Sequence, residues 1–529
     1  MTASAPWILG LFAILALQSC SRDSTTSDQT SLRRGLSGEP ATLDPSTAAD
    51  NFSVQVVQDL YEGLVREGPN GEILPGVASS WLVNDKGTSY TFQLRPNARW
   101  SNGQPVLAKD FVAAWQRTVD PKSGSPVSND LRLIAGAAAI ISGKSSPTSL
   151  GVVAASDTEL VVQLEQPAVY FPQLLAHPSA FPVFSDIAAE SHNANTWVSN
   201  GAYVLSEWRP GSRLELVKNE LYWNNSNVHI QKVQYLIATD QNAQFAQYRA
   251  GQLDVTDTIP TNALSALRAE HPNEVVIAPF SAVAYLGLNM TSSPFEGNLK
   301  LRQALSMSID RRRLVDALAA GQVEAFAIVP PGIWNYDSVP LEWGNLTGAE
   351  RIARAKRLYM EAGYSPTAPL HLRLLLNSSP SIKQTATLVA AMWKEELGVE
   401  TALSDEEFKV FLQTRKNKKR WDVIRLAWNA DYNDASNFLD IFRSGSANND
   451  TGYANSAYDS ILDAAATTSA PDARRELLES AEKKLLADGS AIPLYFFVSK
   501  HLVKPYVLGF KPNPFDRIRS QFLVIAPHE

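Results

Sequence analysis

The sequence predicts an α/β protein with two or three lobes, and three observations carry this prediction. The chain has 529 residues, more than a single hydrophobic core usually accommodates. Its content of 45% hydrophobic and 19% charged residues is that of an ordinary globular protein. Between residues 370 and 428, strand patterns alternate with helix patterns. This alternation is typical of a parallel sheet whose strands are joined by right-handed crossovers.

The first twenty residues have the pattern of an export signal. Residues 6–17 form an apolar run too short to span a membrane comfortably, as expected for the h-region of a secretory signal. The sequence Leu17-Gln18-Ser19-Cys20 then resembles a bacterial lipobox, in which the chain is cut before the cysteine and the thiol carries lipid. The n-region lacks Lys and Arg, and Gln18 is unusual in a lipobox, so an uncleaved anchor or a plain signal stays open as an alternative. We expect residues 1–20 to be a signal peptide with lipidation at Cys20.

A polar stretch separates this signal from the folded body. Residues 21–31 contain nothing apolar to bury and are predicted to form a flexible tether. Cys20 is the only cysteine, so the chain cannot form an intramolecular disulfide. No later segment approaches eighteen consecutive apolar residues, so a lipid anchor is the only membrane contact that we expect.

Local patterns predict the elements of the first part of the body, which begins near Leu32. Residues 56–65 have apolar side chains at helical spacing, and Gly63 lies near the end of this predicted helix. Residues 89–95 alternate apolar and polar side chains, as a half-buried strand does. Residues 108–119 are predicted to form a helix.

The C-terminal part of the body alternates strands with helices. The predicted elements are a strand at 370–376, a helix at 385–397, a strand at 399–403, a helix at 406–413 and a strand at 422–428. Gly398 is placed to end the first of these helices. The last strand is followed by a polar run with one early carboxylate, Asp431. Since α/β sheets bind ligands beyond the carboxyl ends of their strands, Asp431 is a candidate for meeting a cationic group; its alternative role is to open a turn or cap the next helix.

Composition and motifs argue against several classes of function. The net charge of −7 disfavours nucleic acid as a partner, because that would call for a basic face. The seven His are scattered, with no pair at metal-binding spacing, so we expect no metal site. No Gly-x-Ser-x-Gly elbow occurs, and Gly143-Lys144-Ser145 lacks the first Gly of a P-loop because Ala138 stands there. We therefore expect no catalytic residues and no cofactor.

Short motifs occur along the chain in a recognisable order. They are TLDP, DLYEGLV, PGVASSW, YTFQLRPNARWSNGQPV, DFVAAWQRTVDP, NGAY, YWNN, YRAGQLD, RQAL, EAGY and IPLY. In order and spacing, this series resembles the oligopeptide-binding proteins of bacterial ABC importers, an extracytoplasmic solute-binding family that also takes dipeptides and nickel. The resemblance covers nearly the whole chain after residue 31.

This resemblance implies a two-lobed periplasmic-binding-protein fold with an extra inserted domain and mixed sheets flanked by helices. It implies a discontinuous domain I of residues 32–61, 183–281 and 498–529, an inserted domain II of residues 62–182, and a domain III of residues 282–497. The implied function is to capture oligopeptides between two lobes that close about a hinge, and to pass them to an ABC permease in the inner membrane. We expect an exported monomer in the periplasm or cell envelope that does no chemistry on its ligand.

The resemblance also implies which residues bind the peptide. Asp431 matches the family's acidic residue for the ligand α-amino group. The other matched positions are the strand residues Ala427, Trp428 and Asn429, the opposing Asn51 and Phe52, the arginines Arg415 and Arg425, and the aromatic pocket residues Phe408 and Tyr285. Arg415 also begins a basic run, 415–420, and such runs often form a solvated face.

Three positions depart from the family pattern. Ala319 and Ile382 stand where better-known relatives carry a Lys and a His for the ligand's carboxylate, and Gly287 replaces an acidic pocket residue. These departures leave the preferred peptide length open. A dipeptide, a murein peptide, a sugar or a metal chelate in the same fold is the main alternative, and a surface-anchored hydrolase or a lipoprotein scaffold is a further one.

Overall fold

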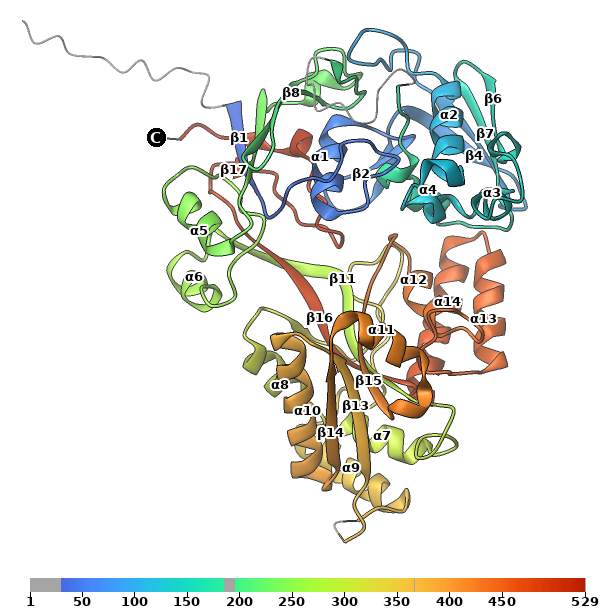
Figure 1. Ribbon diagram of the computed structural model, residues 1–529, viewed down its shortest axis with the longest axis vertical. Helices are drawn as coiled ribbons and strands as arrows, with labels where there is room; N and C mark the ends of the chain where they lie inside the picture. The colour runs from blue at the N-terminus through green and yellow to red at the C-terminus, as the bar shows by residue number, and fades with distance from the viewer. Residues whose placement is uncertain (1–29, 185–195, 366, 529) are drawn as a thin grey trace, which may run out of the picture.

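The computed structural model describes residues 30–184, 196–365 and 367–528 of the chain. Figure 1 shows an upper lobe and a lower lobe joined by two long strands, β11 and β16. Buried apolar side chains form one large cluster in the upper lobe and another in the lower lobe, with a small third cluster around Leu253. The predicted signal peptide, Cys20 and most of the predicted tether lie outside the described residues.

The first part of the upper lobe is built on a four-stranded sheet with the order β1-β10-β9-β8. β1 pairs with β10 in parallel, and the other neighbours are antiparallel. Its elements are β1 (Ser31–Leu36), α1 (Asn51–Leu60), β8 (Tyr203–Arg209), β9 (Arg213–Lys218), β10 (Lys232–Ile237), α5 (Gln241–Arg249) and α6 (Leu264–Glu270).

The end of the chain completes this part of the upper lobe. β17 (Val507–Leu508) pairs with β18 (Val524–Ile525). The buried Arg34 of β1 donates from Nη1 to the Ile518 carbonyl oxygen at 2.7 Å. The Ser520 amide donates to Asp59 Oδ1 of α1 at 2.9 Å. The first and last segments of the body therefore lie side by side.

A second part of the upper lobe is inserted between α1 and β8, and we call it the inserted part. It has an antiparallel sheet with the order β4-β5-β7-β6, and it shares the large apolar cluster of the upper lobe. Its elements are β2 (Val65–Glu67), β3 (Ile73–Pro75), β4 (Ala78–Val83), β5 (Ser89–Leu94), α2 (Ala108–Val119), α3 (Ala137–Ile141), β6 (Val152–Ser156), β7 (Glu159–Gln163) and α4 (Phe171–Leu175).

The lower lobe is built on a six-stranded mixed sheet with the order β12-β16-β11-β15-β13-β14. Its strands are β11 (Val275–Leu288), β12 (Val323–Glu324), β13 (His371–Asn377), β14 (Glu400–Glu406), β15 (Val423–Asn429) and β16 (Ala491–Leu502). Its helices are α7 (Leu299–Met307), α8 (Arg311–Leu318), α9 (Gly348–Glu361), α10 (Pro380–Leu397), α11 (Phe408–Lys416), α12 (Ser436–Leu439), α13 (Ser456–Thr467) and α14 (Pro471–Asp488).

Two antiparallel strands, β11 and β16, run from one lobe to the other (Figure 1). Their pairing has a register shift between Pro279 and Val283, where the ladder is interrupted. In this interruption, the Ser281 amide donates to the Pro514 carbonyl oxygen of the C-terminal segment at 2.6 Å. An interrupted ladder bends more easily than a continuous one, so this is a point at which the connection can bend.

The C-terminal strands and helices agree with the sequence predictions. β13 pairs in parallel with both β14 and β15, as the alternation of elements predicts. α10 ends at Gly398, whose φ of 77° is in the left-handed region that favours glycine. β15 also pairs with β11, and that pairing is antiparallel, which makes the complete sheet mixed. The predicted strand at 89–95 and helix at 108–119 are likewise confirmed as β5 and α2.

The predicted helix at 56–65 is wrong in its position. α1 spans Asn51–Leu60, and the chain is extended from Tyr61. The Asn200 side chain explains this ending, because its amide bonds to both the amide and the carbonyl of Glu62. A Cβ at the adjacent Gly201 would lie 2.5 Å from the Leu60 carbonyl carbon, so only glycine fits. The NGAY motif therefore fixes the end of α1 from outside the helix.

Candidate functional site

A cavity of about 680 Å³ lies between the lobes and against the two crossing strands. Asn51 and Phe52 reach it from the start of α1. Asp130 and His177 reach it from the inserted part, and Asp431 reaches it from the lower lobe. The crossing strands contribute Phe280, Phe497 and Val498 to its wall. The cavity is therefore formed by the upper lobe, its inserted part and the lower lobe together.

Asp431 lies just beyond the carboxyl end of β15, as the sequence predicts. Antiparallel pairing with β11 brings Asn429 opposite Ala282, and the Ala430 amide donates to the Ser281 carbonyl oxygen at 2.9 Å. The chain then leaves the sheet at the cavity, which directs Asn429, Ala430 and Asp431 into its lining. The position of Asp431 thus follows from the end of the strand.

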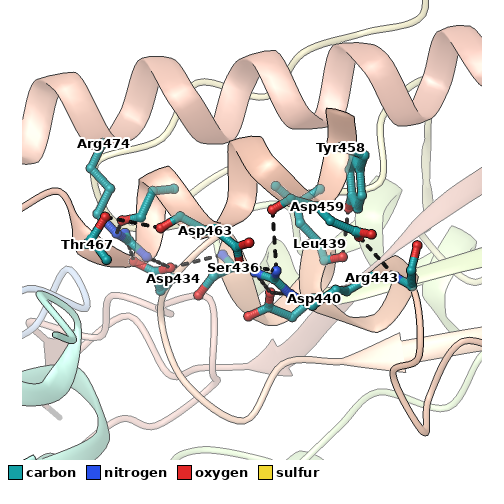
Figure 2. A network of polar contacts seen from close by, with 12 residues as sticks. Asp434, Ser436, Leu439, Asp440, Arg443, Tyr458, Asp459, Asp463, Thr467 and Arg474 are labelled. Atoms are coloured by element: carbon teal, nitrogen blue, oxygen red, sulfur yellow. Dashed lines mark hydrogen bonds and ion pairs between the residues drawn. The ribbon is translucent and has the colours of Figure 1, made fainter. Parts of the chain in front are cut away.

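A polar network fixes the chain immediately after Asp431 (Figure 2). Asp434 accepts two hydrogen bonds from Arg474 of α14, at 2.6 and 2.9 Å, and both side chains are buried. Asp434 Oδ1 also accepts from the Ser436 amide at 2.9 Å. Tyr458 of α13 donates to the Leu439 carbonyl oxygen at 2.7 Å. The loop that carries Asp431 is therefore held by two helices of the lower lobe.

The same loop also contacts the upper lobe. The rings of Tyr432 and Tyr170 stack with centroids 4.9 Å apart, and Tyr432 belongs to the apolar cluster of the upper lobe. The Arg474 guanidinium lies 5.2 Å from the centre of the Tyr170 ring. The Asn433 side-chain amide donates to the Gly71 carbonyl oxygen at 3.3 Å. Tyr432 and Asn433, which follow Asp431, thus contact the upper lobe, where Tyr170 is the aromatic partner. We call the contact of Tyr170, Tyr432 and Asn433 the pivot contact between the lobes.

The surroundings of Asp431 change its acidity. The side chain is exposed to the cavity, but the protein around it restricts water, and this burial raises the pKa of the Asp431 carboxyl. A hydrogen bond from the Asn437 side chain partly offsets the rise. The charge of Asp130 raises the pKa further, whereas Arg132 and His177 lower it. Asn437 is itself fixed, because its Oδ1 accepts from Trp428 Nε1 at 2.7 Å.

Asn51 and Phe52 occupy the first turn of α1. Asp50 caps this helix, with its Oδ1 accepting from the Ser53 amide at 2.8 Å. Asn51 is exposed and Phe52 is half-buried. Phe52 packs against Gly38, where a Cβ would come within 2.3 Å of its ring. The absence of a side chain at Gly38 therefore gives the Phe52 ring its place at the cavity.

Three predicted residues form a separate polar cluster on the lower lobe. Arg425 is 5% exposed and donates from Nη2 to the Tyr495 hydroxyl at 2.8 Å. Arg415 forms an ion pair with Asp450 at 3.1 Å. Burial and Asp450 raise the pKa of Tyr285, while the charges of Arg415 and Arg425 lower it, so these side chains are close neighbours. The described residues that line the cavity do not include Arg425, Arg415 or Tyr285 in this arrangement of the lobes.

The remaining predicted residues lie along α11 and β15. Phe408 is 56% exposed at the start of α11, and its ring stacks on Phe411. Ala427 is exposed on β15 and Trp428 is half-buried. Neither Phe408 nor Ala427 is among the described residues that line the cavity, so the roles of this group stay predictions.

Sequence reasoning missed the contribution of the inserted part to the site. Asp130 and His177 carry no local motif, and they reach the cavity only because the upper lobe folds over it. Asn437, which orients Asp431, was missed as well. The polar run after β15 was the one available signal for the role of Asn437. A loop in a fixed conformation needs side-chain partners for its backbone groups and carboxylates.

The described part of the chain holds no group of three or more His, Cys, Asp or Glu side chains arranged to bind a metal ion. Its helices include none with the length and apolar character needed to cross a membrane. The cavity lining combines aromatic and apolar side chains with many polar and charged ones, among them Asp130, Asp431, Arg34, Lys500 and Arg517. Its position between lobes is a usual one for a ligand-binding site.

Comparison with known proteins defines the class to which this fold and cavity belong. Residues 72–450 match the bacterial extracellular solute-binding proteins, family 5. The match spans most of the chain, and the chain belongs to this family of solute-binding proteins.

Individual relatives align over nearly the whole chain. The periplasmic murein peptide-binding protein MppA of Escherichia coli is 37% identical over 94% of this chain and 93% of its own length. The periplasmic oligopeptide-binding protein OppA of Salmonella typhimurium is 36% identical over 95% of this chain and 93% of its own length. A probable deoxycholate-binding periplasmic protein of E. coli, YgiS, is 34% identical over 100% of both chains.

Solved structures of MppA are similar to this protein over nearly the whole chain. The unliganded open form of MppA matches with a TM-score of 0.89 at 35% identity, covering 94% of this chain and 98% of that one. A second structure, of the E. coli murein tripeptide-binding protein MppA, matches with a TM-score of 0.73 at 36% identity. It covers 94% of this chain and 99% of its own chain. The arrangement of the lobes in this protein is therefore similar to that of the unliganded open form of MppA.

Proposed function

We propose that this protein captures oligopeptides in the cavity between its lobes and delivers them to an ABC permease in the inner membrane. The observation that carries the proposal is the position of Asp431 at the carboxyl end of β15, in a cavity that Asn51 and Phe52 enter from the other lobe. A carboxylate in a partly water-excluded site is suited to a ligand ammonium group. The names of MppA and OppA, which bind peptides, support the same ligand class.

Recognition that ignores peptide sequence needs fixed partners for the groups that every peptide shares. Asp431 is the proposed partner of the α-amino group. The backbone of Ala427, Trp428 and Asn429 at the end of β15 can pair with the peptide backbone, as an added strand does. The space around the cavity walls can hold water, which adapts to different side chains. No bond of the ligand is broken in this scheme.

Closure of the lobes completes the site. The proposed units are domain I at 32–61, 183–281 and 498–529, domain II at 62–182, and domain III at 282–497. The boundaries at 281 and 497 fall within β11 and β16, beside the interrupted ladder, which suits a hinge. Bending there would carry the cluster of Arg415, Arg425 and Tyr285 toward the ligand, where the arginines could meet ligand carboxylates.

The proposed location is the periplasm, reached by export of a chain with a signal peptide and a lipid anchor at Cys20. The periplasmic relatives support the location. The protein is proposed to act as a monomer that contacts the membrane through the anchor and through the permease.

A second ligand class comes from one relative. YgiS is described as a probable deoxycholate-binding protein, and deoxycholate is an anionic steroid. Arg34, Lys500 and Arg517 line parts of the cavity and could meet an anion there. At Asp431 and Asp130, however, an anion would meet like charge, whereas an ammonium group would be attracted. The proposed site at Asp431 therefore favours a ligand with a free amine over a bile acid.

Mass spectrometry of released ligands tests the proposal. The chain without residues 1–20 is refolded, exposed to a peptide mixture and to deoxycholate, and washed before the bound molecules are released. Intact peptides of several sequences are expected. Cleaved peptides would indicate a hydrolase, and deoxycholate alone would indicate a bile-acid-binding protein; either result contradicts the proposal.

A further inference from the structure

The inserted part presents a second carboxylate to the site of Asp431. Asp130 lies in the short helix Ser128–Leu131 and lines the same cavity as Asp431, but from the upper lobe. Its side chain is 35% exposed, so a ligand in the cavity can reach it. It is close enough to Asp431 for its charge to raise the pKa of that carboxyl.

Neighbouring side chains hold Asp130 in place and lower the pKa of its carboxyl. His177 Nδ1 lies 3.4 Å from Asp130 Oδ2 and 2.8 Å from the Ser179 hydroxyl oxygen. Burial alone would raise the pKa of Asp130, but hydrogen bonds from His177 and Ser179 and the charges of His177 and Arg517 lower it overall. The lowered pKa favours the ionised form of the Asp130 carboxyl, which is the form that binds an ammonium group.

Two carboxylates on opposite lobes oppose closure of an empty cavity and favour closure of a cavity that holds a cation. Without a cation between them, Asp130 and Asp431 repel each other, and closure would strengthen the repulsion as water leaves. A ligand ammonium between them turns both contacts into attractive, charge-assisted ones. A neutral end, such as an N-acetylated peptide, leaves the repulsion in place.

We propose that Asp130 is a specificity-determining residue that clasps the ligand amine together with Asp431, so that the lobes close preferentially on peptides with a free amino terminus. This inference rests on the proposed function and adds a residue of the inserted part to the amine site. Arg132 and His177, which also face Asp431, limit the negative charge of the empty site. The ligand class is then a peptide with an unmodified α-amino group.

Competitive capture from a defined mixture tests the inference. The mixture contains alanine peptides of two to five residues, each in free and N-acetylated form at equal concentration. The measured quantity is the ratio of free to acetylated peptide released from the washed protein. Asp130→Asn is expected to lower this ratio roughly tenfold, the loss of one charge-assisted contact. Asp130→Glu keeps the charge, so its ratio of free to acetylated peptide is expected to be close to that of the unaltered protein.

Two controls separate this role from a structural one. Asp85→Asn removes an exposed carboxylate of the inserted part that lies outside the cavity lining, and it should leave the ratio unchanged. Asp431→Asn should lower the ratio at least as much as Asp130→Asn. An unchanged ratio in Asp130→Asn, or equal loss of free and acetylated peptides, overturns the inference while the proposed function stands. Capture of no peptide by the unaltered protein overturns both.

Discussion

Asp431 combines two properties that an amine-binding carboxylate needs. It is accessible from the cavity, yet its surroundings restrict water enough to raise its pKa. Asn437 supplies a fixed hydrogen bond, and Trp428 in turn holds Asn437. The side chain is therefore oriented before any ligand arrives, which reduces the entropy lost on binding.

Binding of free-amine peptides is expected to weaken as the solution becomes acidic. The Asp431 carboxyl must be ionised to hold an ammonium group, and its raised pKa means that protonation begins at a higher pH than for an ordinary Asp. Affinity should thus fall as the pH drops through the raised pKa of the Asp431 carboxyl. Calorimetric titration between neutral pH and pH of about 4 measures this.

Asp431→Asn is the control for this pH dependence. Asp130, Arg132 and His177 face the same carboxyl, and all three remain in the variant. The variant should bind free-amine peptides about 10-fold to 100-fold more weakly at neutral pH, and the part of the pH dependence that comes from Asp431 should vanish. An equally steep acid loss in the variant would assign the effect to the other groups.

At the scale of elements, the loop after β15 depends on helices distant in the sequence. Arg474 of α14 holds Asp434 and lies over the Tyr170 ring of the inserted part. Its guanidinium therefore stabilises the loop that carries Asp431 and contributes to the pivot contact between the lobes. Burial of this ion pair makes it costly to leave either partner alone.

Arg474→Met is expected to destabilise the protein by about 3–5 kcal/mol, because it leaves the Asp434 carboxylate buried without its partner. Urea denaturation followed by tryptophan fluorescence measures the loss. Arg475→Met on the same helix is the matched control, since Arg475 has partially exposed partners and its loss should cost less than about 1 kcal/mol. The double variant Asp434→Asn with Arg474→Met should recover part of the stability; equal effects of the two single Arg variants would contradict this account.

The sequence was informative where a pattern is local. The strands and helices from β13 to β15 follow from alternating apolar residues, and the position of Asp431 follows from the end of β15. The pairing of β11 with β16 joins segments about 200 residues apart, and no local pattern specifies such a partner. The same reason hides Asp130, whose approach to Asp431 depends on how the lobes pack. The end of α1 was misplaced because Asn200 and Gly201, far along the chain, decide it.

At the scale of the whole molecule, two contacts join the lobes beside the cavity. One is the pair of crossing strands, with its interrupted ladder near Pro279. The other is the pivot contact of Tyr170, Tyr432 and Asn433. If the lobes close as proposed, two contacts of this kind would favour rotation about the line between them.

Closure on peptide is expected to reduce the radius of gyration measured by small-angle X-ray scattering. The starting point is the arrangement described above, which is similar to the unliganded open form of MppA. A saturating free-amine peptide should make the protein more compact, and the same concentration of its N-acetylated form should do so to a smaller extent. A radius of gyration that stays constant under a peptide shown by calorimetry to bind would contradict the closing mechanism.

The return of the chain end to its beginning also determines when the protein can finish folding. β16 lies between β12 and β11 in the lower sheet, and it begins only at Ala491. In the upper lobe, Arg34 bonds to Ile518 and Asp59 to Ser520, across 484 and 461 residues. Neither lobe can complete its core until the last segment of the chain has been made, so the polypeptide stays incompletely folded throughout its synthesis. If the chain is exported as proposed, this delay keeps it in a state that can still be threaded through a membrane channel.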